Sequence, residues 1–157
     1  MQVRNAETAD MVEVAALSRA LAAHVRDPDP GKDARVLATC GFGPDRWFEC
    51  LVAVAGTRII GFATYCRIFE AHTREKRLWV GDLYVRPEAR RSGAGRALIA
   101  ALRERAEALG CAGLTLELAR GNNVARSFYE KLGARPSDQV DVVRISTPRN
   151  GTGRGAQ

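Results

Sequence analysis

Three strand-like runs follow one another in the middle of the chain without a helix between them. They span residues 48–55, 58–69 and 78–85. Gly56-Thr57 alone joins the first two, and so short a link predicts an antiparallel hairpin. The third run ends before Pro87, which has no N–H to donate to a neighbouring strand. A chain built this way is expected to form a sheet whose first connections are antiparallel.

Helical periodicity flanks these strands on both sides. The other expected elements are a strand at 3–4, helices at 8–23 and 32–39, a helix between Gly93 and Gly110, a strand at 114–118, a helix from 122 to 133 and a strand at 140–145. Apolar side chains at three-to-four spacing define the helices, and Thr8 is the expected N-cap of the first. Strand–helix–strand crossovers pair strands in parallel. The sequence therefore predicts an α/β fold with a single mixed, mostly antiparallel sheet flanked by helices on both faces.

Length and composition indicate one ordinary globular domain. The chain has 157 residues, of which 46% are hydrophobic and 27% charged, enough for a core without disulfides or metals. We expect a single domain over residues 1–146 and a flexible C-terminal tail over 147–157, which has no apolar side chain larger than alanine. The longest apolar run, at 50–55, is far shorter than the roughly 20 residues of a membrane span. With no apolar leader at its start, the protein is predicted to be cytoplasmic and not membrane-bound.

The titratable residues argue against a metal site and against nucleic acid. The four cysteines are scattered without a C-x-x-C pair, and there are only two histidines. The net charge of +6 comes from arginines spread along the chain, with one concentration at 86–96. A nucleic-acid site would need aromatic side chains interleaved with arginines on an exposed sheet, whereas this concentration lies at an expected turn. No metal and no nucleic-acid partner are predicted.

The arginine-rich turn, in which a strand leads through small residues into a helix, is the most informative segment. The first N–H groups of a helix lack partners and carry partial positive charge, so a helix N-terminus can hold phosphate. The small side chains are those of Ser92, Gly93, Ala94 and Gly95, and the added charges are those of Arg90, Arg91 and Arg96. Small side chains let an anion approach the main chain closely. Anion binding is the favoured interpretation, and a turn whose glycines serve geometry alone is the alternative.

Two familiar nucleotide motifs do not fit this turn. A Walker loop needs a lysine that is missing here. A dinucleotide fingerprint needs Gly or Ala where the chain has Leu98, and it normally follows the first strand instead of the fourth.

The turn instead resembles the acyl-CoA pyrophosphate loop of the GNAT N-acetyltransferase superfamily. The match is Arg90-x-x-Gly93-x-Gly95 after a strand ending Leu83-Tyr84-Val85. A second signature follows downstream, an Asn at 122 or 123 and then Phe128-Tyr129-x-x-x-Gly133-Ala134. The resemblance covers roughly residues 2 to 146. Within the superfamily the nearest likeness is to the diamine and spermidine/spermine acetyltransferase-like group, carried by Gly41-Phe42-Gly43 and Asp82-Leu83-Tyr84-Val85.

This resemblance implies direct transfer of acetyl from acetyl-CoA to a primary amine of a small molecule in a ternary complex. The amine would be a polyamine, a diamine or an amino-acid-like compound, and the enzyme a homodimer. Backbone N–H groups from Arg91 to Arg96 would hold the pyrophosphate. The edge of the strand at Leu83, Tyr84 and Val85 would pair with the pantetheine arm, with the N–H of Leu83 or Val85 stabilising the thioester oxygen. Asn122 and Ala125 complete the implied CoA contacts, and Asn122 is equally explained as a helix N-cap.

The resemblance implies one catalytic residue, and position along the chain indicates the other. It implies that Tyr129 is the general acid that protonates the departing thiolate. The attacking amine must also lose a proton. Asp82, the acid nearest the reacting strand, is the preferred acceptor, and an ion pair with an arginine would explain it equally. His72, Glu117 or a water chain are the other candidate acceptors. The chain departs from the polyamine-acetylating group at Gly81 and at His24-Val25, where that group has acids. Neither these departures nor a charge of +6 favours a polyamine.

Of four other functions weighed against this one, two stay open. A catalytically idle acyl-CoA sensor would keep every CoA-binding residue, and an enzyme that acetylates a protein or peptide amine would share the same fold. A nucleotide-dependent oxidoreductase and a basic nucleic-acid module lack the features they need. Turnover with an amine distinguishes the first two from each other.

Overall fold

The computed structural model describes residues 1–31, 33–137 and 140–146. The chain divides into two compact units, Met1–Ala119 and Arg120–Gln157, and each is described by itself. Lys32, where the second helix was expected to begin, and the expected tail at 147–157 lie outside the described residues.

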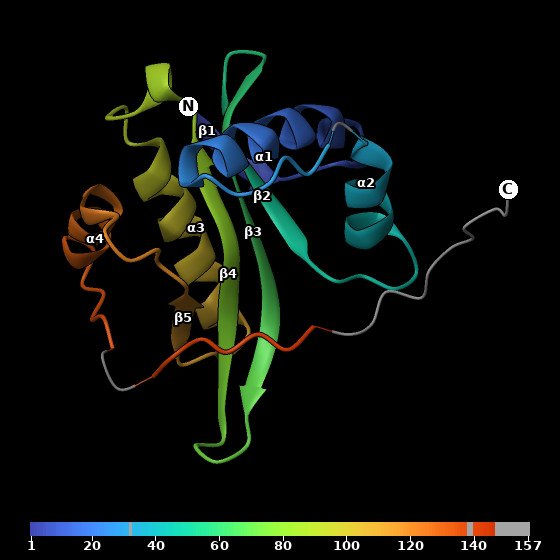
Figure 1. Cartoon of the computed structure of the whole chain (residues 1–157). Coiled ribbons are helices and arrows are strands. Elements are labelled where there is room, and N and C mark those ends of the chain that lie inside the picture. The colour runs from blue at the N-terminus through green and yellow to red at the C-terminus, as the bar shows by residue number, and fades with distance from the viewer. Residues whose placement is uncertain (32, 138–139, 147–157) are drawn as a thin grey trace, which may run out of the picture. The chain divides into compact units, whose positions relative to one another are not determined.

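The first unit is built on a five-stranded sheet in the order β1-β2-β3-β4-β5 (Figure 1). The strands are β1 (Gln2–Asn5), β2 (Glu49–Ala55), β3 (Arg58–Glu70), β4 (Glu75–Val85) and β5 (Gly113–Leu116). The first four pair antiparallel, whereas β4 and β5 pair in parallel because a helix crosses between them. This confirms the mixed, mostly antiparallel sheet and the short hairpin link between β2 and β3.

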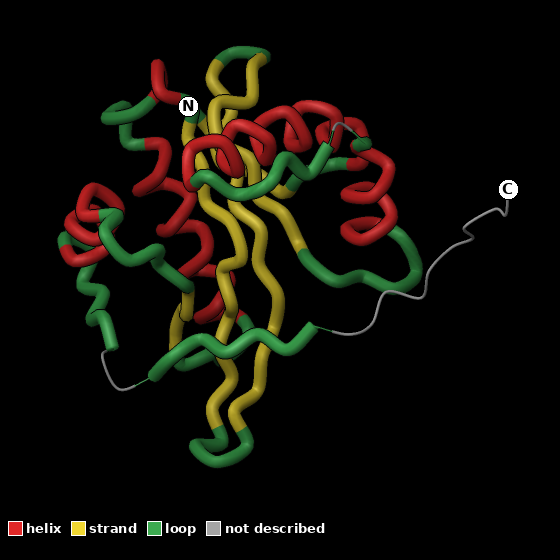
Figure 2. The backbone as a smooth tube through the Cα atoms, in the orientation of Figure 1, coloured by secondary structure: helices red, strands yellow, loops and turns green. Residues whose placement is uncertain are grey.

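Helices cover both faces of this sheet, as the tube in Figure 2 also shows. They are α1 (Met11–Val25), α2 (Ala34–Phe42) and α3 (Ala94–Ala108), and the second unit contains α4 (Asn123–Glu130). Between α1 and the sheet lies a buried hydrophobic cluster that includes Met11, Leu17, Val52 and Phe62. Leu51, one position along β2, points to the other face and lines a groove with α3, as the two-residue period of a strand requires.

The expected strand at 140–145 does not form, and that prediction was wrong. No residue from 140 to 146 is in a strand or helix, and Val143 and Ile145 are exposed. A β-branched run favours a strand only where a pleated, half-buried surface receives it. Composition alone does not show whether such a partner exists.

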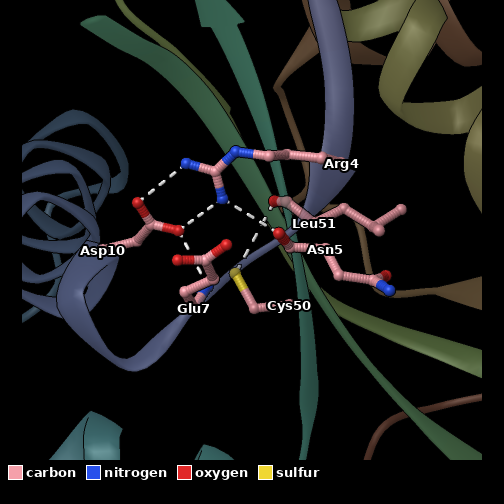
Figure 3. Close-up of polar contacts among 6 residues, drawn as sticks. All are labelled: Arg4, Asn5, Glu7, Asp10, Cys50 and Leu51. Atoms are coloured by element: carbon pink, nitrogen blue, oxygen red, sulfur yellow. Dashed lines mark hydrogen bonds and ion pairs between the residues drawn. The ribbon is translucent and has the colours of Figure 1, made fainter. Parts of the chain in front are cut away.

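The N-cap expected at Thr8 was also wrong. A 3-10 turn at Thr8–Asp10 precedes α1, and the backbone N–H of Glu7 donates to Asp10 Oδ2 at 2.7 Å. Arg4 holds the same carboxylate in two hydrogen bonds, 2.6 and 3.0 Å long (Figure 3). That guanidinium keeps the pKa of Asp10 below its usual value. A charged pair between β1 and the start of α1 therefore replaces a hydroxyl cap.

The β3–β4 hairpin is longer than expected. Glu70 pairs with Glu75 at its end, so the turn is only 71–74 where the sequence indicated 70–77. Its tip extends past the rest of the sheet (Figure 1), because β2 pairs with β3 only as far as Glu49↔Tyr65.

Candidate functional site

The C-terminal part of β4, after Gly81, has one free edge. Within the described residues, β5 pairs with β4 only along Arg77–Val80, so Asp82, Leu83, Tyr84 and Val85 pair with β3 alone. The N–H of Arg86 donates to the Ile60 carbonyl on β3 at 2.9 Å. Because N–H groups of an antiparallel strand alternate between its two edges, those of Leu83 and Val85 lie at the free edge. Such an edge can accept an extended ligand as a further strand.

A bulge interrupts β4 immediately before this edge. Thr64 pairs with Asp82 and Tyr65 pairs with Val80, so Gly81 is the extra residue. Asp82 is half-buried on the α1 face of the sheet, next to the pair of Phe62 and Tyr84. The sequence-predicted proton acceptor is therefore adjacent to the free edge.

The turn after β4 presents unpaired backbone donors. A 3-10 turn at Pro87–Ala89 leads to Arg91 and Gly93, whose φ angles are 65° and 91°, and α3 begins at Ala94 with Gly93 as N-cap. No described residue accepts from the backbone N–H groups of Arg91, Gly93, Ala94, Gly95 or Arg96. Ser92 is committed, since both its hydroxyl and its N–H donate to the Ala89 carbonyl, at 2.7 and 3.4 Å.

This geometry fits a phosphate group. The unpaired N–H groups lie at the positive end of the 15-residue helix α3. Arg90, Arg91 and Arg96 flank them in the chain, and all three are exposed. The turn and the free edge of β4 are consecutive in the chain, so one ligand with a phosphate and an extended arm can contact both.

Tyr84 links the turn to the end of α1. Its side chain is only 6% exposed. The Arg90 guanidinium lies 5.7 Å from the centre of its ring, and the His24 ring meets it edge-on with centroids 6.5 Å apart. Arg90 also donates from Nε to the Val85 carbonyl at 3.2 Å. Two contacts thus fix Arg90 beside the turn.

In the sequence, His24 stands out only as a departure from the family pattern, and no role is predicted for it. The structure places it on the last turn of α1, against Tyr84. No local signal in the sequence indicates this contact, since it depends on how α1 crosses the sheet.

The alternative proton acceptors lie elsewhere. His72 is in the exposed turn at the tip of the β3–β4 hairpin. Asp82 is seven positions along β4 from Glu75 at the tip, which is about 23 Å at 3.3 Å per residue. Glu117 is exposed directly after β5. Of the three candidate side chains, Asp82 is the one that lies on β4 beside the free edge.

In the second unit, Asn122 caps α4. Its side-chain oxygen accepts from the N–H of Ala125 at 3.1 Å, which confirms the N-cap interpretation and commits the Ala125 N–H. Tyr129 is half-buried, and its ring meets that of Phe128 edge-on with centroids 5.1 Å apart. Burial raises the pKa of the Tyr129 hydroxyl, so this group is protonated at neutral pH.

Cys50 is paired with Thr64 across β2 and β3, on the same face as Asp82. Burial, with smaller contributions from the negative charges of Asp10 and Asp82, raises the pKa of its thiol from 9.0 to about 12. The thiol is therefore expected to be inert at neutral pH.

This burial predicts alkaline lability. In the unfolded chain the thiol ionises near pH 9, whereas in the folded chain it stays protonated, so folding stability falls as pH rises between about 9 and 12. In urea melts the wild type should lose about 1.4 kcal/mol more per pH unit than Cys50→Ala in that window. Burial also raises the pKa of Tyr65 to about 12. Because both proteins contain Tyr65, its contribution cancels in the comparison. Parallel pH dependences would contradict this assignment.

Metal-binding and membrane-spanning features are both missing from the described ranges. No group of three or more His, Cys, Asp or Glu side chains there is placed to hold a metal ion. Among those residues, no helix combines the length and apolarity that a bilayer crossing requires.

Comparisons with known proteins agree with this geometry. The model of the "Acetyltransferase (GNAT) family" matches residues 15–134. A thialysine N-epsilon-acetyltransferase of Sus scrofa is 30% identical over 148 residues, covering 88% of this chain and 86% of that protein. The structure of a ribosomal-protein-alanine N-acetyltransferase from Brucella melitensis biovar Abortus 2308 is 27% identical with a TM-score of 0.72, covering 92% of this chain and 100% of that one. An integron cassette protein from the mobile metagenome of V. cholerae shares the fold, with a TM-score of 0.78 at 22% identity over 93% of this chain and 92% of that one.

Proposed function

Because the chain belongs to the acetyltransferase (GNAT) family and is an acetyl-CoA-dependent N-acetyltransferase, we propose that it acetylates a primary amine of a small molecule. The observation that carries this proposal is the run of N–H groups at the start of α3 that no described residue pairs, one turn after the free edge of β4. Few anionic ligands extend far enough to use both, and CoA, with a pyrophosphate and a strand-like pantetheine arm, is one.

In this proposal, the turn holds the pyrophosphate with the N–H groups of Arg91 and 93–96. Arg90 adds charge from a position fixed by Tyr84 and the Val85 carbonyl. Leu83 and Val85 offer edge N–H groups to the arm, and one of them stabilises the thioester oxygen as negative charge develops on it. Asn122 contributes its amide N–H₂, because its oxygen is committed to the helix cap.

The chemistry is direct transfer in a ternary complex. Asp82 accepts the proton that the amine loses as its nitrogen forms a bond to the acetyl carbon. Tyr129 donates a proton to the sulfur as the carbon–sulfur bond breaks, and both residues then exchange protons with solvent. The assignment of Tyr129 rests on its motif and on its protonation at neutral pH.

The favoured acceptor is a compound like an amino acid with a terminal amine. The relative from Sus scrofa is named for thialysine, an acceptor of this kind. Gly81 supplies no acid beside Asp82, and the chain carries a net charge of +6, which does not favour a polycation. We also infer a homodimer from the family resemblance, which sedimentation equilibrium tests.

A panel assay of thiol release from acetyl-CoA tests this function. The panel contains thialysine, lysine, a diamine, spermidine, an aminoglycoside and a peptide with an N-terminal alanine. We expect turnover with an amino-acid-like amine and intersecting initial-rate lines, as a ternary complex requires. Preference for the peptide would support a protein acetyltransferase like the Brucella melitensis relative. Acetyl-CoA binding without turnover on any amine would contradict the proposal and indicate a sensor.

A further inference from the structure

The β4 bulge is held by a side chain of the neighbouring strand, that of Thr64. The N–H of Asp82 donates to the Thr64 hydroxyl oxygen, at 3.0 Å. The same hydroxyl donates its proton to Asp82 Oδ2, at 2.8 Å. One hydroxyl thus holds both the backbone and the carboxylate of Asp82.

The Thr64 side chain has little freedom to rearrange. Thr64 is only 8% exposed on the central strand β3, and its branched side chain has few rotamers. A hydroxyl has one proton, so its donation to Oδ2 fixes which carboxylate oxygen is occupied. No hydrogen bond from a described residue reaches the other oxygen, Oδ1.

Gly81 is fitted to this arrangement. Its φ does not lie in the left-handed region, so backbone freedom does not explain the glycine. A Cβ built there would lie 3.1 Å from the Thr64 hydroxyl oxygen, its one neighbour within 4 Å among the described residues, which is tighter than an ordinary contact. The missing side chain leaves the hydroxyl the room that it needs between the two strands.

We propose that Thr64 is a positioning residue for acetyl transfer, which locks the bulge at Gly81 and presents Asp82 Oδ1 to the substrate amine. This inference rests on the proposed function, because the role of Asp82 as proton acceptor belongs to it. Leu83 directly follows Asp82 in β4. The same lock therefore also fixes the position of the Leu83 N–H at the free edge. Thr64 itself touches no reacting atom.

A pair of substitutions at Thr64 tests the lock. Thr64→Val keeps the shape of the side chain and removes the hydroxyl, whereas Thr64→Ser keeps the hydroxyl. We expect Thr64→Val to lower kcat about tenfold, with the KM for acetyl-CoA changed less than about twofold, because misplacing a reacting group slows chemistry more than binding. Thr64→Ser should recover kcat to within about threefold of the wild type. Equal kcat in Thr64→Val and wild type, or equal losses in both variants, would overturn the proposal.

Hydrogen–deuterium exchange of the peptide that contains residues 80–85 gives a readout without catalysis. Exchange should be faster in folded Thr64→Val than in the wild type and unchanged in Thr64→Ser. Gly81→Ala should act in the same direction by displacing the hydroxyl. Wild-type exchange in both Thr64→Val and Gly81→Ala would overturn the lock. If the wild type turned over no amine, the proposed function would fail, while this comparison would still decide whether Thr64 locks the bulge.

Asp82→Asn separates the lock from the proton acceptor. The amide oxygen can still accept from the Thr64 hydroxyl, so exchange at 80–85 should stay slow while kcat falls. Fast exchange in this variant would show that the carboxylate charge, and not the hydroxyl geometry, closes the bulge, which contradicts the proposal.

Discussion

Tyr129→Phe is expected to lower kcat by about a hundredfold, the size of effect typical of a lost general acid. The KM for acetyl-CoA should stay within about threefold of the wild type, because the ring remains and only the proton is lost. Burial raises the pKa of the Tyr129 hydroxyl, so the wild-type group carries that proton at neutral pH. The measurement is steady-state thiol release with the preferred amine at saturating acetyl-CoA.

Tyr65→Phe is the matched control for Tyr129→Phe. It also removes a buried phenol hydroxyl, one that donates to Glu49 Oε2 at 2.9 Å, and Tyr65 is 1% exposed. We expect a loss of stability of about 1 kcal/mol with kcat unchanged. Equal kcat losses in the two variants would remove Tyr129 from the mechanism.

Gly93→Ala is expected to raise the KM for acetyl-CoA at least about tenfold, which corresponds to about 1.4 kcal/mol of lost binding. Gly93 has a φ of 91°, and a Cβ added to it would meet no atom of a described residue within 4 Å. An alanine there is opposed by backbone strain and not by a clash. Relief of that strain would turn the N–H groups of 93–96 away from a bound pyrophosphate. Isothermal titration with CoA measures the effect directly.

Gly110→Ala controls for the stability cost of Gly93→Ala. Gly110 lies just past the other end of α3, with a φ of 65° and the same open space around it in the described part of the chain. Both variants should lose about 1 kcal/mol of stability, but CoA affinity should fall only in Gly93→Ala. Equal CoA affinity in the two variants would contradict the role of the turn.

The elements with strong local signals were predictable from the sequence. The two-residue link at Gly56-Thr57 sets the β2–β3 hairpin, and the strand–turn–helix around Gly93 sets the parallel crossover to β5. Asn122 capping of α4 was likewise visible, as one of two neighbouring asparagines. In each of these cases the residues that decide the structure lie within a few positions of one another.

The features that the sequence did not reveal depend on distant partners. The run at 140–145 has the composition of a strand but pairs with none of the described strands. The bulge at Gly81 and its lock join residues 18 positions apart in the chain. Asp82 could be predicted as an acid beside the reacting strand, but not that Thr64 holds it, because register between β3 and β4 decides that contact. Arg4 likewise replaces the expected Thr8 cap through pairing across six positions.

The most direct test of acetyl transfer is to measure thiol release and acetylated amine together in one reaction, with thialysine as the amine and acetyl-CoA as the donor. Mass spectrometry counts the acetylated product, and a thiol reagent counts free CoA. We predict one acetylated amine for each thiol released, with both rates lowered in parallel in Tyr129→Phe. Thiol release without acetylated amine, from thialysine or any other member of the panel, would show hydrolysis in place of transfer and would contradict the proposed function.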